Sequence, residues 1–254
     1  MGPCTCRYPR IRAICRKKGL QLAPNIIISY DGTPTDDDAL ALGKVFADAG
    51  ASPSLAYVRH TPESERGREN AVQREAEELL ERGASKLGRP DVARHVVLDA
   101  STPEGLRVLA DREGAEVVIF GSEYRTAAGH VAPGTSAARL LADGSTAVAL
   151  ATAGLSQLEE PRIATIAATG SDGDDSAEQT ARSLAQRIGA TVVPLTHEHA
   201  DLIIVGSRPE AAEGQVSVSA ASEYLIEIST CPVLVVPRGV AVKFGAAVEA
   251  AATA

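Results

Sequence analysis

Two short stretches of the chain combine residue types that could bind a nucleotide. Asp31-Gly32-Thr33 supplies a carboxylate directly after a strand-like apolar run, and Gly121 to Ser136 supplies three glycines and ends at the predicted start of a helix. Free backbone N–H groups and the positive end of the helix dipole favour an anion there, and Thr135 and Ser136 add hydroxyl donors. A carboxylate for the nucleoside and amides for the phosphates together suit a nucleotide. In the structural alternative, the glycines only permit tight turns and Ser136 only caps the helix.

Other chemically capable residues give weaker signals. The pair of histidines at 197–199 could ligate a metal, but histidines beside a shortened connection are more often loop residues. Cys4, Cys6 and Cys15 lie in a basic leader without periodicity. The chain contains no G-x-x-x-x-G-K-[ST], H-E-x-x-H or G-x-S-x-G motif. We therefore expect no metal site and no committed catalysis beyond, at most, slow ATP hydrolysis.

The elements that must position the two loops follow from the apolar pattern. From Asn25 onward, short aliphatic runs alternate with helical ones, which is typical of parallel strands buried on both faces in the α/β class. Thr35 followed by Asp38 is the predicted capping box of the first helix. The predicted strands are 25–30, 54–58, 93–100, 115–121 and 146–151, and the predicted helices are about 35–49, 70–87, 103–113 and 136–142. Ligands bind at the carboxyl ends of such strands, where both loops lie.

A tandem duplication divides the chain. Residues 119–154 repeat at 204–239 with a constant offset of 85, and upstream the offset is 138, because Gly32 meets Gly170. The second copy therefore lacks 53 residues from its middle, and the connection after 191–197 is too short for an ordinary crossover between parallel strands. Either residues 191–195 pair with the sheet in an unusual way, or part of this segment forms an extended crossover. The predicted organisation is a basic disordered leader (1–24), a first domain (25–154), a linker (155–160), a truncated second domain (161–239) and a C-terminal tail (240–254), for which we predict a frayed Ala-rich helix.

Charge and composition exclude several classes of partner. The 254-residue chain has a net charge of −8, and its first 24 residues carry +6, which leaves −14 for the rest. Such an acidic body argues against general nucleic-acid binding. An aromatic content of 3% without Trp argues against ring-stacking sites. The apolar runs are strand-sized, well below the ~20 residues of a membrane span. We expect a cytoplasmic protein that binds neither nucleic acid nor membrane.

The two loops and the repeat resemble the universal stress protein family over about residues 25–153 and 162–239. Nucleotide-binding members carry an acidic residue after the first strand and G-x2-G-x9-G-[ST] after the fourth, and this chain has Asp31 and the spacing Gly121, Tyr124, Gly134-Thr135. The resemblance implies an open, parallel five-stranded sheet with helices on both faces, of the adenine-nucleotide α-hydrolase type, duplicated in tandem with a shortened second copy. It also implies ATP or a related adenine nucleotide as ligand, with or without Mg²⁺. The implied binding residues are Asp31, Gly32, Thr33, Val58, Gly121, Ser122, Arg125, Gly129, Gly134, Thr135 and Ser136.

The chain departs from the family pattern in both copies. In the first, Tyr124 replaces the second motif glycine, which would strain the backbone or block the phosphates if that position needs a positive φ, although Gly129 offers alternative room. In the second, the carboxylate, two glycines and a hydroxyl are missing, with Thr169 at the position of Asp31. We expect the second copy to be a non-binding partner that packs on the first in an intramolecular pseudo-dimer, with a further homo-oligomer left open. The last strands, 146–151 and 231–236, either pair across this interface or lie inside separate sheets. The alternative function is a ligand-free scaffold with both sites degenerate.

Overall fold

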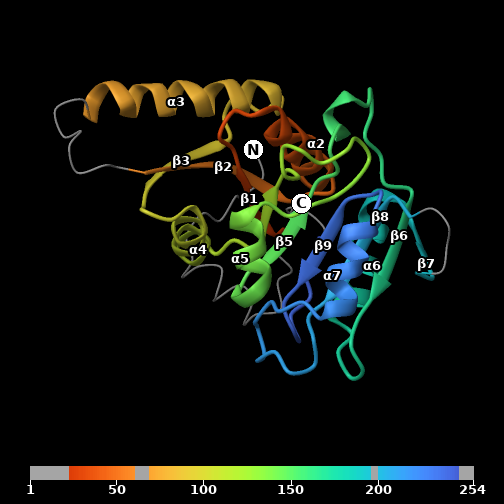
Figure 1. Cartoon of the computed structure of the whole chain (residues 1–254). Helices are drawn as coiled ribbons and strands as arrows, with labels where there is room; N and C mark the ends of the chain where they lie inside the picture. Colours follow the sequence, from red (N-terminus) through yellow and green to blue (C-terminus); the bar gives the residue numbers. More distant parts are fainter. Residues whose placement is uncertain (1–22, 61–68, 196–199, 246–254) are drawn as a thin grey trace, which may run out of the picture.

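Nine strands of the described residues join in one sheet (Figure 1). The structure is a computed structural model that describes residues 23–60, 69–195 and 200–245. The strands are β1 (Asn25–Ser29), β2 (Ser52–Arg59), β3 (Ala93–Leu98), β4 (Val117–Phe120), β5 (Ala147–Leu150), β6 (Thr165–Thr169), β7 (Thr191–Val193), β8 (Leu202–Gly206) and β9 (Val233–Val236). The helices are α2 (Pro34–Asp48), α3 (Glu69–Lys86), α4 (Thr102–Glu113), α5 (Thr135–Asp143), the 3₁₀ turn η2 (Leu155–Gln157), α6 (Ser176–Ile188) and α7 (Ala220–Ile228). The predicted leader lies outside the described residues.

The sheet consists of two parallel units that meet in one antiparallel pair. The strand order is β3-β2-β1-β4-β5-β9-β8-β6-β7, and we call β1 to β5 with their helices the first unit and β6 to β9 with theirs the second. All pairs within each unit are parallel, whereas β5 and β9 pair antiparallel, with Ala149 opposite Leu234. The α/β class and the five-stranded parallel sheet are confirmed. Of the two interpretations of the last strands, pairing across the interface is correct.

Two hydrophobic cores explain why these sequences form a sheet covered on both faces. Alternate strand residues such as Ile28, Leu55 and Ile204 face α2, α3 and α6, while Ile27 and Val205 lie in the second core, under α4, α5 and α7. Each such side chain is almost fully buried, and its burial stabilises the fold by roughly 1.5–3 kcal/mol. Strands buried on both faces must be nearly continuous aliphatic runs, as these are.

The strand register corrects the upstream offset of the duplication. Ile26 pairs with Val117, and Ile166 pairs with Leu202, which is the repeat of Val117 at the offset of 85. Ile166 is therefore equivalent to Ile26, so the upstream offset is 140 and not 138. It follows that Ser171, not Thr169, takes the place of Asp31 in the second unit, and that 55 residues are missing from its middle. The loop between β6 and α6 is two residues longer than that between β1 and α2 and places the helix starts at an offset of 142, so the match at 138 follows neither the strands nor the helices.

Residues 191–193 of the shortened middle form a strand of the sheet. They pair in parallel with β6, as Ile166 opposite Val192 shows, and β8 lies on the other side of β6. The connection from β7 to β8 therefore leads from one side of β6 to the other, and its residues 196–199 lie outside the described residues. Val193 and Ala200, at its two ends, pack against the core that α4 covers in the first unit.

The segments that follow β5 and β9 are packed parts of the fold. After β5, Leu155 of η2 is buried against α2, in the stretch predicted as a linker. After β9, Val242 and Phe244 are each 2% exposed, and their backbone N–H groups donate to hydroxyl groups on α6. The ring of Phe244 meets that of Phe46 on α2 edge to face, 5.5 Å between centroids. The predicted frayed helix is thus wrong for 240–245; residues 246–254 lie outside the described part.

Candidate functional site

The predicted site residues come together at the carboxyl edge of β2, β1 and β4. These three strands are neighbours and run parallel, so the loops that follow them lie along one edge of the sheet. Asp31, Gly32 and Thr33 follow β1, Val58 lies near the end of β2, and Gly121 follows β4. The two sequence stretches singled out for their chemistry are therefore adjacent in space.

The loop after β1 is held by the first turn of α2. Thr33 is the N-cap of α2, with extended φ and ψ of −81° and 160°, and Asp36 is the reciprocal residue of the capping box. One oxygen of Asp36, Oδ2, accepts hydrogen bonds from the backbone N–H of Asp31 (2.9 Å) and of Thr33 (2.9 Å) and from the Thr33 hydroxyl (2.7 Å). The predicted capping pair of Thr35 and Asp38 is therefore wrong by two residues: Asp38 is turned toward another segment.

Asp31 has an unusual proton affinity for an aspartate on an exposed loop. Its side chain lies at the rim, yet surrounding protein atoms still remove part of the solvent from its carboxyl group. This desolvation, together with the negative charge of Asp36, raises the pKa of Asp31 to about 6 against the opposing effect of His60. Strongly perturbed carboxyl groups of this kind cluster at functional sites.

Val58 presents its backbone groups, and not its side chain, at this edge of the sheet. The side chain is 4% exposed and packs in the core under α4. The N–H of Tyr30 donates to the carbonyl oxygen of Ala56, so the backbone of Ala56 faces β1. Because backbone direction alternates along a strand, the N–H and C=O of Val58 face the same side, where β1 has already ended at Ser29. A donor and an acceptor side by side match the edge of a nucleobase.

Gly121 is required for packing. A Cβ built at this glycine would lie 1.9 Å from the backbone oxygen of Thr35, in the first turn of α2. Any side chain here would push the end of β4 away from α2. The first motif glycine therefore sets the distance between the two loops of the site.

The chain between Ser122 and Pro133 is a closed hairpin. Ser122 and Pro133 form an antiparallel bridge, and the N–H of Glu123 donates to Ala132 O. The Ser122 hydroxyl is buried, donates to Ala151 O (2.7 Å) and accepts from the N–H of Ala132. Gly129 turns the hairpin with a φ of +81°, a conformation that strongly favours glycine. The hydroxyl of Ser122 is thus engaged within the hairpin.

The helix that follows this hairpin begins with open space. Gly134 is the N-cap of α5, has no side chain to cap the helix, and nothing lies within 4 Å of where its Cβ would be. Thr135 is exposed and Ser136 half-buried in the first helical turn. Unpaired N–H groups of this turn and the two hydroxyls form an accessible anion cradle.

Tyr124 occupies the place of the second motif glycine without backbone strain. No non-glycine residue among those described has a positive φ, so this position does not need glycine here. The Tyr124 side chain is 69% exposed. Its phenol oxygen accepts a hydrogen bond from Arg125 Nε, and the guanidinium carbon lies 5.1 Å from the ring centroid. The pair places a cation on the outside of the hairpin.

The second unit repeats the hairpin but not the open helix start. Ser207 repeats the bonds of Ser122 at the offset of 85, donating to Val236 O and accepting from the N–H of Ser217. At the start of α7, however, Ser219 caps the helix by accepting from the N–H of Ser222. The Ser171 hydroxyl also donates to Ser207 O and so ties the two strand ends together. The corresponding edge of the second unit therefore has a capped helix start and strand ends joined by a hydrogen bond.

Two further properties concern the described residues alone. They contain no group of three or more His, Cys, Asp or Glu side chains arranged to hold a metal ion. The histidines at 197 and 199 and the leader cysteines lie outside them. None of the described helices is long and apolar enough to cross a membrane.

Comparisons with known proteins agree with this geometry. The sequence model of the universal stress protein family matches residues 196–237. A universal stress protein from Archaeoglobus fulgidus superimposes with a TM-score of 0.64 at 15% identity, over 85% of this chain and 98% of its own. The chain has the fold of this universal stress protein. A putative universal stress protein (TM-score 0.56, 94% of its chain) and a protein of unknown function (0.57, 93%), both from Pseudomonas aeruginosa, each match 85% of this chain at 14% identity and have the same fold. A search of curated proteins gives no match.

The family resemblance did not point to every residue that shapes the site. Asp36 was not singled out, and Asp38 only as a capping residue, although each carboxylate fixes a neighbouring segment by several hydrogen bonds. The sequence signal for these residues was the run of three aspartates in the first turns of a helix, where acidic side chains interact favourably with the helix dipole. The sequence could not show which segment each aspartate contacts.

Proposed function

We propose that the first unit binds ATP or a related adenine nucleotide, and that the chain acts as a stress-response or regulatory protein of the universal stress protein type. The observation that carries this proposal is the contrast between the two units. Both have the same hairpin, but only the first has an open helix start at Gly134 and a carboxylate at the position of Asp31, where the second has Ser171. The second unit is proposed to be a non-binding packing partner.

Each part of an adenine nucleotide has a matching group at the first edge. The Val58 backbone offers a donor and an acceptor to the adenine, and Asp31, when ionised, accepts from ribose hydroxyls. Gly134, Thr135 and Ser136 offer N–H and O–H donors to the phosphates. Gly32, Thr33 and Gly121 shape the space between them, while Ser122 and Gly129 maintain the hairpin that leads into α5.

Arg125 gives the proposed site its preference for charged ligands. The guanidinium is exposed and held beside the Tyr124 ring, so it can reach an anion without a large loss of side-chain freedom. Mg²⁺ would be carried in by the phosphates, because a magnesium ion bound with a nucleotide usually keeps several waters and needs few protein ligands. A cytoplasmic location belongs to the same proposal, since ATP is a cytoplasmic ligand.

Calorimetric titration of the full chain with ATP, with and without Mg²⁺, tests the proposal. We expect saturable binding that Asp31→Asn and Gly134→Val each weaken by about tenfold or more, the loss of one charge-assisted contact. Ser219→Val, the counterpart of Gly134→Val in the second unit, is the matched control and should leave affinity unchanged. No heat with ATP at high micromolar concentration would refute nucleotide binding and favour the ligand-free scaffold.

A further inference from the structure

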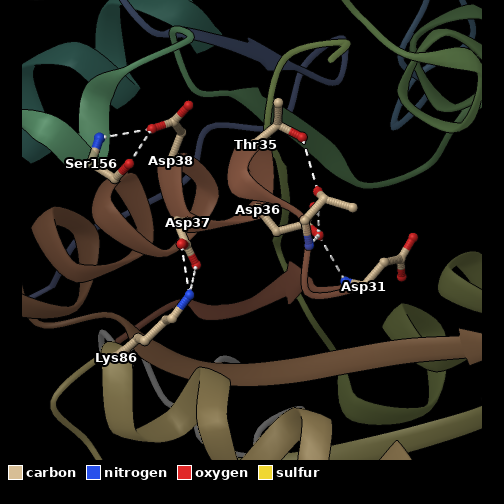
Figure 2. A network of polar contacts seen from close by, with 8 residues as sticks. Asp31, Thr35, Asp36, Asp37, Asp38, Lys86 and Ser156 are labelled. Atoms are coloured by element: carbon tan, nitrogen blue, oxygen red, sulfur yellow. Dashed lines mark hydrogen bonds and ion pairs between the residues drawn. The ribbon is translucent and has the colours of Figure 1, made fainter.

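Three consecutive aspartates in the first turns of α2 each hold a different segment of the chain (Figure 2). Asp36 binds the loop after β1, as described above. Asp37 pairs with Lys86 at the end of α3, with 2.7 Å between Oδ2 and Nζ. Asp38, which is 3% exposed, accepts from the backbone N–H groups of Gly154 and Ser156 and from the Ser156 hydroxyl. The start of α2 is therefore the point at which the edges of the proposed site are joined.

We propose that Asp36 is a positioning residue of the nucleotide site: its Oδ2 holds the backbone of residues 31–33 so that the Asp31 side chain is presented to the ligand. This inference rests on the proposed function. The bond from the Thr33 N–H belongs to an ordinary capping box, but those from the Thr33 hydroxyl and from the Asp31 N–H lie outside it. Figure 2 shows the consequence, because the Asp31 backbone turns toward Asp36 while its carboxylate points away from it.

The charge of Asp36 gives it a second effect that a neutral capping residue could not have. Desolvation and this charge both raise the pKa of Asp31, and His60 acts in the opposite direction. The pKa of Asp36 is itself raised by burial and by Asp37, but the donors of Thr33 and Asp31 act in the opposite direction. Asp31 therefore gains its negative charge close to neutral pH, and its contact with ribose hydroxyls should strengthen as pH rises through about 6.

The first test needs no nucleotide. In the full chain labelled with ¹³C at aspartate carboxyl carbons, Asp31 should titrate near pH 6. Asp36→Asn should move this midpoint toward the ordinary value of 3.8, because it removes the neighbouring negative charge. Asp37→Asn is the matched control: it loses the ion pair with Lys86 but touches no atom of the loop, and it should leave the Asp31 midpoint in place. An unchanged midpoint in Asp36→Asn would overturn the inference.

The second test measures whether Asp36 acts through Asp31. ATP affinity is compared with that of 2′-deoxy-ATP and 3′-deoxy-ATP for the single variants Asp31→Asn and Asp36→Ser and for the double variant. Asp36→Ser leaves the N-cap residue Thr33 in place and replaces only the side chain at N3. We expect each single variant to weaken ATP binding by about tenfold and the double variant to be no weaker than Asp31→Asn, which is the non-additivity of coupled residues.

The outcomes separate the two proposals. If the wild-type chain binds no adenine nucleotide, the proposed function fails, while the Asp31 titration still decides whether Asp36 controls its loop. If nucleotide binds and the losses in the two single variants add in the double variant, Asp36 acts independently of Asp31 and the positioning role is refuted. If Asp36→Ser lowers only thermal stability and preserves discrimination against the deoxy nucleotides, Asp36 is a helix cap alone.

Discussion

Gly121 lies where the end of β4 meets the first turn of α2, and we expect an alanine there to force these elements apart. Its Cβ would lie 1.9 Å from the Thr35 oxygen and 2.6 Å from the Thr35 carbonyl carbon, whereas real Cβ contacts essentially never fall under 3.0 Å. The α2 backbone must therefore move by about 1 Å. Overpacking of this kind costs roughly 1–3 kcal/mol, and we expect the upper end because the contact is rigid backbone. About 3 kcal/mol is roughly a hundredfold in the unfolding equilibrium.

Urea unfolding of three alanine variants measures this effect against matched glycines. At Gly206, the counterpart of Gly121 in the second unit, the nearest atom to a new Cβ is 3.1 Å away, and at Gly134 none lies within 4 Å. The loss of stability should therefore decrease from Gly121→Ala through Gly206→Ala to Gly134→Ala, the last within about 1 kcal/mol of wild type. If Gly121→Ala is as stable as Gly134→Ala, the packing account of the first motif glycine is wrong.

Four further changes test other contacts. Asp38→Ala should lower the free energy of unfolding by about 2–3 kcal/mol in urea titrations, because it leaves the donors of the segment after β5 without their carboxylate. Ser122→Ala and Ser207→Ala should each cost about 1–3 kcal/mol by the same measurement, and by similar amounts, because each loses the same pair of hairpin bonds. Asp31→Asn should raise the thermal midpoint relative to wild type at about pH 7 and not at about pH 4. The folded wild-type chain holds the carboxyl proton of Asp31 more tightly than the unfolded chain does, so wild-type stability falls as pH rises through 4 to 6. Cys231, whose pKa burial raises to about 12, should react with a thiol reagent at about pH 8 only as fast as the chain unfolds.

The strands were predictable because aliphatic runs indicate burial directly, whereas the pairing of the last strands across the interface was one of two alternatives that the apolar pattern left open. The run at 25–30 became β1, and the runs at 146–151 and 231–236 became the antiparallel pair of β5 and β9. Residues related by the constant offset of 85 also have equivalent structures, including the hydroxyl hydrogen bonds of Ser122 and Ser207. Strands and repeats were predictable because they depend on composition and spacing, which can be read directly from a sequence.

The contacts of single polar side chains were not predictable in the same way. Thr33 and Thr35 are both acceptable N-caps, and Thr33 is the cap because α2 begins at Pro34, a residue type favoured at the first helical position. The offset of 138 was supported by a match of glycines and aspartates, but the matched aspartates lie inside α2 in the first unit and before α6 in the second. Strand register, fixed by the partners of Ile26 and Ile166, is needed to find the true equivalence.

The contacts between the units explain why the second can be short. The second unit meets the first through the pairing of β9 with β5 and through the contact of Phe244 with Phe46. Two hydrogen bonds also join the units: the Val216 N–H donates to Gly144 O, and Arg187 donates to Ala49 O at the end of α2. None of these contacts involves the missing middle, whose counterparts α3, β3 and α4 include the edge of the first unit far from β5. The hairpin of the second unit packs in the shared core through Val216, which is fully buried. In the second unit this loop architecture therefore contributes to the interface.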